Sequence, residues 1–320
     1  MNAFMKAVRL HEYGGPEVLK YEEVPRPLAW NDEVLVRVHG SGINPFDAKV
    51  RAGHMRGTLD HTLPLILGWD FSGVIEEVGN EVTSFKVGDA VYGRPDTQRN
   101  GSYAEYVAVR ATEIAQKPRN IDHVHAAAVP LAALTAFQAL FGTDAREPSI
   151  DLSRGQRILI HGASGGVGSF AVQLARWRGA RVIATSSKEH LGVVRELGAE
   201  EVVDYQAQSF ESVVKDVDAV LDLVGGDVTK RSIQVLRPGG VLASTLGGLS
   251  EEEANEHGIR SVSVLTRTSS TELAAIGSLI EESVIKVSVS QIFSLEEAQK
   301  AHEAIEAGHT RGKIVLRIAN

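Results

Sequence analysis

The sequence predicts an α/β protein in which a doubly wound parallel sheet is inserted in a β-rich domain. Short strands with period-two alternation fill the first third, whereas apolar runs alternate with helical segments from Arg157 onward. The last segment, 287–320, is too short to fold alone and is expected to pack back on the first domain. The predicted domains are therefore 1–128 with 284–320, and 129–283.

The β-rich domain is predicted from short runs separated by turn signals. Two strands, 5–10 and 19–24, flank the turn Gly14-Gly15-Pro16. Further strands are expected at 33–38, 73–79 and 87–93, and no long helical period interrupts them before about residue 120.

Alternating strands and helices predict the second domain. Residues 124–140 are rich in Ala and Leu at helical spacing, and strands follow at 157–161, 181–185, 201–204, 218–224, 239–244 and 261–265. Repeated strand–helix–strand units form parallel sheets. Near the C-terminus, the capping signal at 294–297 starts a helix between two strands, the second of which is 313–317.

Composition excludes several classes of protein. The net charge is −8 and no dense Lys/Arg run is present, so nucleic acid is a poor partner. No apolar stretch approaches the ~18 residues that a membrane-spanning helix requires, and no signal peptide is evident, so we expect a cytoplasmic protein without a membrane partner. The chain has no cysteine, which excludes disulfides, thiolate catalysis and four-thiolate zinc sites.

A glycine-rich turn carries the strongest functional signal. The segment 162–168, Gly-Ala-Ser-Gly-Gly-Val-Gly, follows a strand and precedes the helical run 169–176, which is the context of a dinucleotide fingerprint. Glycines allow the backbone to approach a pyrophosphate, and the helix N-terminus offers it N–H groups. Ala163 replaces the first fingerprint glycine. The alternative is a turn of a βαβ unit that binds no ligand.

The end of the next strand favours NADPH over NADH. An NAD site would place Asp or Glu there, on the ribose 2′-hydroxyl, but this chain has Ser186, Ser187 and Lys188. Two hydroxyls and an ammonium can bind a 2′-phosphate that a carboxylate would repel. Glu189 argues the other way, and Ser187 and Lys188 also fit the simple start of a helix.

Together these segments resemble the zeta-crystallin and quinone oxidoreductase branch of the medium-chain dehydrogenase/reductase superfamily. The resemblance covers essentially the whole chain in order and rests on the stretches 163–168, 42–47, 68–79 and 312–316. It implies a Rossmann sheet inserted in a GroES-like catalytic domain, and a homodimer paired through Rossmann sheet edges, with 262–265 a candidate edge.

The resemblance also implies a zinc-independent protein. Zinc-dependent relatives carry a cysteine near the position of Asn44 and a His-Glu pair after the glycine that matches Gly68, whereas this chain has Trp69 and Asp70. We therefore assign no metal site. Two histidine pairs, His54 with His61 and His123 with His125, are the remaining candidate ligands, but they lack a thiolate.

Carried over position by position, the resemblance assigns the cofactor site. Asn44 lies beside the nicotinamide and the substrate, with Thr135 on the opposite wall, and Tyr205 contacts the adenosine phosphate region. Residues 223–225 and 245–247, at the ends of the fourth and fifth Rossmann strands, close over the cofactor. The full predicted set is Asn44, Thr135, Ala163, Ser164, Gly165, Gly166, Val167, Ser186, Ser187, Lys188, Tyr205, Leu223, Val224, Thr245, Leu246 and Gly247.

These assignments predict reduction of a quinone or an α,β-unsaturated carbonyl compound by hydride from NADPH. Asn44 would donate a hydrogen bond to the carbonyl oxygen, and Lys49 and water are the candidate proton donors. Some bacterial members carry tyrosines at the positions of Lys49 and Met55, where they line the substrate cleft. This chain lacks both tyrosines, which weakens the case for an aromatic quinone as the substrate. Asn44 also fits a turn before Pro45, and Asp47 fits a helix cap.

Two other functions stay open. The first is a non-catalytic NADPH-binding protein that keeps the fold without turnover. The second is a 2-enoyl-thioester reductase, which needs a catalytic tyrosine in the cleft, with Tyr92 and Tyr103 available.

Overall fold

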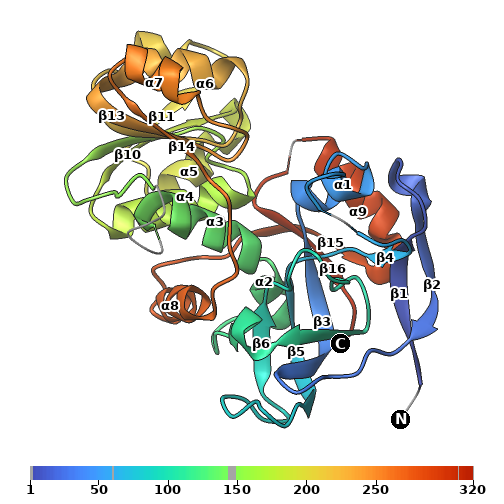
Figure 1. Cartoon of the computed structure of the whole chain (residues 1–320). Helices are drawn as coiled ribbons and strands as arrows, with labels where there is room; N and C mark the ends of the chain where they lie inside the picture. The colour runs from blue at the N-terminus through green and yellow to red at the C-terminus, as the bar shows by residue number, and fades with distance from the viewer. Residues whose placement is uncertain (1–2, 60, 143–148, 309, 320) are drawn as a thin grey trace. The chain divides into compact units, whose positions relative to one another are not determined.

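The computed structural model describes residues 3–59, 61–142, 149–308 and 310–319. The chain forms two compact units (Figure 1). The first comprises Met1–Leu131, Thr268–Ser283 and Val287–Asn320, and the second Ala132–Arg267 with Val284–Lys286. The predicted boundaries at 128/129 and 283/284 differ from this division mainly in placing 268–283 with the nucleotide-binding domain.

Helix α8 (Ser270–Glu281) explains that difference. The Tyr92 hydroxyl of the first unit donates to the Leu273 carbonyl, and the Asn120 amide donates to the Ile280 carbonyl over 2.9 Å. Sequence pattern identifies a helix here but does not indicate which sheet it packs against.

The larger sheet of the first unit has the strand order β15-β16-β3-β5-β6-β8, with β7 also paired to β3. Its strands are β3 (Glu33–Ile43), β5 (Phe71–Val78), β6 (Ala90–Gly93), β7 (Tyr106–Arg110), β8 (Ile114–Gln116), β15 (Val289–Ser294) and β16 (Lys313–Arg317). A smaller sheet contains β1 (Phe4–Leu10), β2 (Leu19–Pro25) and β4 (Leu65–Ile66). Because β16 pairs with β3, the C-terminal segment does pack back on the N-terminal one.

In the first unit, β6 is shorter than predicted and β3 is longer. β6 begins at Ala90 rather than 87 because Gly88 has a φ of 89° and Asp89 accepts the Lys86 amide over 3.0 Å, which makes a turn. β3 continues to Ile43 because β5 and β16 pair along its second half.

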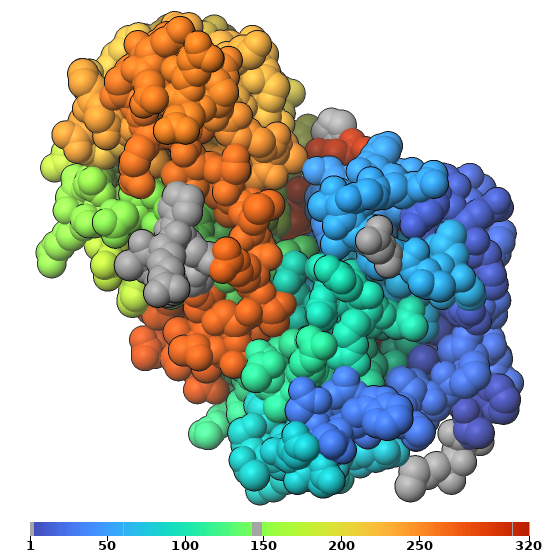
Figure 2. Space-filling view, viewed as in Figure 1, coloured from blue at the N-terminus to red at the C-terminus, as the bar shows by residue number. Residues whose placement is uncertain are grey.

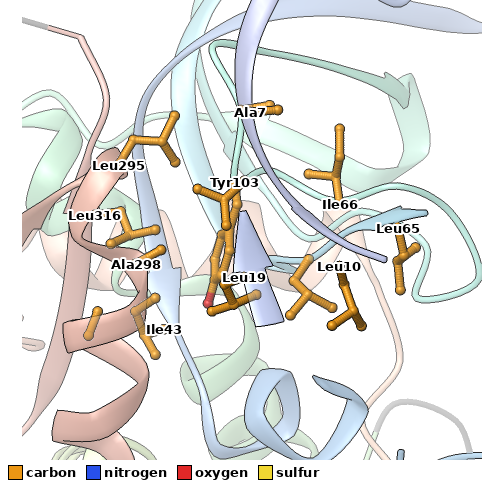
Figure 3. Packing of buried hydrophobic residues seen from close by; sticks show 14 of the residues in the cluster. Ala7, Leu10, Leu19, Ile43, Leu65, Ile66, Tyr103, Leu295, Ala298 and Leu316 are labelled. Carbon is orange, nitrogen blue, oxygen red and sulfur yellow. The ribbon is translucent and has the colours of Figure 1, made fainter. Parts of the chain in front are cut away.

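The core of the first unit surrounds Tyr103. Figure 3 shows its ring among side chains from both sheets and from helix α9 (Ala298–Glu306). The labelled neighbours in this cluster include Leu10, Leu19, Ile43, Leu295, Ala298 and Leu316. Burying each large aliphatic side chain contributes roughly 1.5–3 kcal/mol, so the cluster fixes how α9 lies on the sheets. Helix α1 (Pro45–Arg51) lies against α9 at the surface (Figures 1 and 2).

The second unit contains the predicted parallel sheet, in the order β11-β10-β9-β12-β13-β14. Its strands are β9 (Arg157–Ile160), β10 (Arg181–Ser186), β11 (Glu201–Asp204), β12 (Val217–Asp222), β13 (Leu236–Ser244) and β14 (Arg260–Ser263). Counted along the chain, the spatial order is 3-2-1-4-5-6, which is the Rossmann order. The predicted fold class is thereby confirmed.

Helices connect these parallel strands. They include α4 (Gly166–Trp177), α5 (Leu191–Leu197), α6 (Asp227–Ser232) and α7 (Glu251–Glu256). The helical stretch predicted at 124–140 is two helices, α2 (His123–Ala127) and α3 (Pro130–Phe141), because Pro130 starts a new helix. Within the described residues, no helix is long and apolar enough to cross a membrane.

Candidate functional site

The glycine-rich turn joins β9 to α4 with its backbone accessible. Gly162 has a φ of 68°, and Gly165 is the extended N-cap residue of α4. Residues 164–167 are half-buried. The first N–H groups of an α-helix have no intrahelical acceptor, and they carry the positive end of the helix dipole. A side chain at Gly165 would narrow the turn, because its Cβ would lie 3.3 Å from the Gly162 carbonyl. The turn therefore fits a pyrophosphate.

Gly168 holds the helix close to this turn. A Cβ there would lie 2.2 Å from the Gly162 oxygen and 2.7 Å from the Ala163 Cα. We predict that Gly168→Ala displaces α4, with a loss of about 2–3 kcal/mol in the free energy of unfolding and at least a tenfold loss in NADPH affinity. Calorimetry and thermal unfolding check both quantities. Gly192→Ala in α5 is the control, because its Cβ meets no atom within 4 Å; an equal effect of the two variants would contradict the prediction.

The residues predicted to select NADPH lie at the end of β10 and directly after it, and they differ in exposure. Ser186 is 2% exposed, and its hydroxyl has no partner among the described residues. Ser187 is half-buried and shares a hydrogen bond of 3.1 Å with the His190 ring. Lys188 is exposed and begins a short 3-10 helix, as the simpler interpretation proposed. Of these three residues, only Ser187 and Lys188 reach the surface.

The remaining predicted cofactor residues of the second unit, apart from Thr135, directly follow strands β11, β12 and β13. Tyr205 follows β11 and is 57% exposed. Leu223 and Val224 follow β12, and Thr245, Leu246 and Gly247 follow β13. The carboxyl ends of parallel strands lie at one end of the sheet. These residues therefore lie at the same end of the sheet as the glycine turn. Thr135 instead lies on α3, and its hydroxyl lies 2.6 Å from that of Thr266.

Asp222, the last residue of β12, is a site residue that was not predicted from the sequence. Its fully buried carboxylate accepts the amides of Val224 (2.9 Å) and Gly225 (3.0 Å) and the hydroxyl of Thr229. These bonds end β12 at Asp222, two residues before the predicted end, and shape the turn that carries Leu223. An acidic residue between an apolar strand and two glycines was the available signal.

Asn44 lies in a buried polar cluster of the first unit. It is 4% exposed and precedes α1 directly. Its side-chain Nδ2 donates to Asp70 Oδ2 over 2.9 Å, and its Oδ1 accepts from Lys313 Nζ. Lys313 also donates to Asp70 over 3.0 Å, and the Leu131 backbone amide donates to the other carboxylate oxygen. Four segments that are distant in the sequence therefore meet at one buried ion pair.

This cluster determines how the Asn44 amide is oriented. An ammonium group only donates and a carboxylate only accepts, so Oδ1 must face Lys313 and Nδ2 must face Asp70. Nδ2 carries two hydrogens, and Asp70 takes one. The second N–H has no acceptor among the described residues, which is compatible with the role predicted for Asn44.

Asp47 is the helix cap that the alternative interpretation proposed. Its Oδ2 accepts the Asn44 backbone amide over 2.7 Å and the Tyr103 hydroxyl over 3.0 Å. Tyr103 also lies 3.2 Å from His302 Nε2, and Arg51 lies 3.1 Å from His302 Nδ1. Because arginine only donates, Nδ1 accepts and Nε2–H donates to Tyr103. Burial lowers the pKa of His302 to about 3, so this ring is neutral.

Burial raises the pKa of Asp47 to about 7, and the cap bond from Asn44 opposes that rise. Between its unfolded value near 4 and about 7, the folded state binds the extra proton, so the free energy of unfolding falls as pH rises. We predict that Asp47→Asn removes this dependence. The free energy of unfolding of the variant, relative to that of the native protein, should therefore rise by about 3 kcal/mol between pH 4.5 and pH 8. Thermal unfolding at both pH values tests this; a constant difference would contradict it.

The tyrosines considered for a thioester reductase are both committed elsewhere. Tyr103 and Tyr92 are fully buried, the first bonded to Asp47 and the second to the Leu273 carbonyl. Burial raises the pKa of each phenol above its usual value. Neither hydroxyl is presented to a ligand.

Lys49 lies outside the Asn44 cluster. It is exposed on α1 and lines a surface hollow of about 220 Å³ between α1 and α9. The other lining residues are Pro45, Ala48, Ala52, His54, Ile305 and Glu306. The structure thus brings Asn44 together with Asp70 and Lys313, which were not predicted, but not with Lys49.

The candidate histidine pairs do not converge. His61 bonds to the Thr97 carbonyl, and His125 to Asp122 over 2.7 Å. His123 lies 2.8 Å from the Ser72 hydroxyl and stacks on another imidazole. Trp69, at the position of a metal-binding histidine in zinc relatives, is fully buried. In the part of the chain that the structure describes, no three His, Asp or Glu side chains form a group able to hold a metal ion.

Comparison with known proteins places this geometry in a family. Residues 31–119 match the family described as Alcohol dehydrogenase GroES-like domain, and residues 197–316 match Zinc-binding dehydrogenase. The NADPH-dependent alkenal/one oxidoreductase of Arabidopsis thaliana chloroplasts is 34% identical, over 98% of this chain and 79% of its own. The chain belongs to the quinone oxidoreductase branch of the medium-chain dehydrogenase/reductase family.

Solved structures of this branch have the same fold. Coxiella burnetii quinone oxidoreductase aligns with a TM-score of 0.89 and 35% identity, over 99% of this chain and 100% of its own. Escherichia coli quinone oxidoreductase, solved with NADPH, aligns with a TM-score of 0.86 and 29% identity, over 98% and 99% of the two chains. In this medium-chain oxidoreductase, the predicted GroES-like and Rossmann architecture is therefore confirmed.

Proposed function

We propose that this medium-chain oxidoreductase reduces a quinone or an α,β-unsaturated carbonyl compound with hydride from NADPH. The observation that carries the proposal is the Asn44 amide, which Lys313 and Asp70 orient so that one N–H remains for a ligand oxygen. The accessible glycine turn before α4 supports a nicotinamide dinucleotide as the cofactor. Relatives named alkenal/one and quinone oxidoreductases support the choice of electrophile.

When bound, NADPH supplies the hydride. The residues of this chain then act on charge and orientation. As hydride reaches the electron-poor carbon, negative charge develops on the carbonyl oxygen, and the free N–H of Asn44 stabilises it. The buried Lys313–Asp70 pair holds that amide in position before reaction. Water delivers the proton, since Lys49 lies outside the Asn44 cluster.

A substrate panel tests this function directly. The purified protein, pretreated with chelator, would be assayed for NADPH oxidation against a quinone, a short alkenone and an alkenal. We expect turnover with at least one electrophile and no loss of rate after chelation, because Asn44 and Trp69 stand where zinc ligands would be needed. NADPH binding without oxidation of any electrophile would instead support the non-catalytic alternative.

Preference for NADPH over NADH forms a separate part of the proposal. The exposed ammonium of Lys188 and the half-buried hydroxyl of Ser187 would bind the 2′-phosphate. We predict that Lys188→Glu lowers the NADPH:NADH ratio of kcat/KM roughly 10- to 100-fold. Lys215→Glu is the control. Lys215 is exposed just before β12, at the amino ends of the parallel strands, whereas Lys188 follows the carboxyl end of β10. An unchanged ratio in Lys188→Glu would remove Lys188 from the cofactor site.

Two further predictions concern the protein in solution. We propose a homodimer and a cytoplasmic location. The free edge of β14 supports the dimer, because it is the last strand of the parallel sheet.

A further inference from the structure

A buried arginine next to the Asn44 cluster lacks an anionic partner. Arg94 is only 8% exposed, yet no carboxylate of the described residues lies within 4.0 Å of its guanidinium group. Its Nη1 donates to the Thr268 hydroxyl over 2.7 Å, and its Nε has no acceptor within the described chain. Buried charges in proteins are normally paired, so this one requires an explanation.

Strand register places Arg94 beside the candidate catalytic cluster. β6 ends at Gly93, which pairs with Phe71 at the start of β5. Arg94 directly follows β6 and Asp70 directly precedes β5, so the two residues lie close together, and the Asp70 charge acts on Arg94. Asp70 in turn bonds to the side chain of Asn44. Paired strands lie about 5 Å apart, so Arg94 and the Asn44 cluster share one end of the sheet.

The nearby carboxylates are already occupied. Asp70, Asp96 and Glu113 are among the groups whose charge acts on Arg94. However, Asp70 holds its own buried ammonium, and Asp96 and Glu113 both bond to Arg110. Burial lowers the pKa of Arg94, but an arginine stays protonated at neutral pH. A permanent positive charge therefore remains without a carboxylate partner among the residues that the structure describes.

Thr268 fixes this cation. Its hydroxyl accepts from Arg94 Nη1 and donates to the Arg94 backbone carbonyl over 3.2 Å. Nε, on the other edge of the guanidinium group, has no acceptor among the described residues. Two adjacent N–H groups on such an edge match the two oxygens of a carboxylate.

We infer that Arg94 is a specificity residue that binds a carboxylate on the electrophile, so that the preferred substrates are enones or quinones that carry an acidic group. This inference rests on the proposed function, since it places the reducible carbonyl at Asn44 and the carboxylate at Arg94. A matched pair of probes tests it: 6-oxo-4-heptenoate and its methyl ester. Two methylene groups separate the carboxylate from the enone, so the two probes have similar intrinsic reactivity.

Three proteins would be compared by kcat/KM on both probes: the native chain, Arg94→Gln and Arg119→Gln. The native protein should prefer the acid at least tenfold, and Arg94→Gln should lose roughly 10- to 100-fold on the acid but less than threefold on the ester, mainly through KM. Arg119→Gln removes the same charge from an exposed position and should leave the acid:ester ratio unchanged. No native preference for the acid, or equal losses on both probes, would overturn the inference.

A binding measurement separates this inference from the proposed function. The saturated acid 6-oxoheptanoate and its methyl ester would be titrated calorimetrically into the NADP⁺-loaded protein. Tight binding of the acid that Arg94→Gln weakens at least tenfold supports the carboxylate site even if neither enone is reduced, in which case only the proposed reaction fails. Equal binding of acid and ester, or unchanged binding in Arg94→Gln, overturns the inference even if both enones are reduced.

Discussion

Replacing Lys313 by methionine is expected to destabilise the first unit by about 3–5 kcal/mol, because it leaves the fully buried Asp70 carboxylate without its counter-ion. The Asn44 and Leu131 amides cannot neutralise that charge. Urea unfolding followed by tryptophan fluorescence and far-UV circular dichroism measures the loss.

The double variant Asp70→Asn/Lys313→Met removes both charges and should be more stable than Lys313→Met alone. Lys300→Met is the control. Lys300 pairs with Glu297 at the surface, with 66% of its side chain exposed, and its loss should cost less than about 1 kcal/mol. Additive losses from the two single substitutions at Asp70 and Lys313 would show that the pair is not coupled.

Asn44→Ala is expected to lower kcat on the preferred electrophile roughly 100-fold, with little change in NADPH affinity. The variant removes the side-chain N–H that we propose donates to the substrate carbonyl, and loss of one such donor typically costs that much. It leaves the Lys313–Asp70 ion pair intact. Steady-state kinetics and cofactor titration test both parts.

A structural role alone would give a different result for Asn44→Ala. If Asn44 served only as a turn residue before Pro45, the variant would lose thermal stability while kcat per folded molecule stayed near the native value. Comparing Asn44→Ala with Asp47→Asn, which alters the cap but keeps the Asn44 side chain, separates the two roles.

The nucleotide-binding half was predictable because its signals are local. A glycine turn between a strand and a helix, and apolar runs spaced by helices, identify each element without knowledge of distant contacts. The observed bounds depart by a few residues where side chains end a strand, as the Asp222 carboxylate does after β12. Ser186 is buried because β10 continues to that residue, and its predicted contact with the cofactor stays a prediction.

The Asn44 cluster was not predictable, because it joins residues that are far apart in the sequence. Lys313 lies next to Asn44 only because β16 pairs with β3, with Ile314 opposite Ile43. Asp70 joins them through the pairing of β5 with β3. Antiparallel register is set by the whole sheet, so no local pattern reveals which polar strand ends will meet.

The proposed reaction is tested most directly by following the hydride. The metal-free protein would be incubated with NADPH carrying two deuterium atoms at C4 and with a short alkenone, and the product examined by NMR. We expect one deuterium on the former β-carbon of the enone, without added zinc. Product formation that requires zinc, or a product whose β-carbon carries no deuterium, would contradict it.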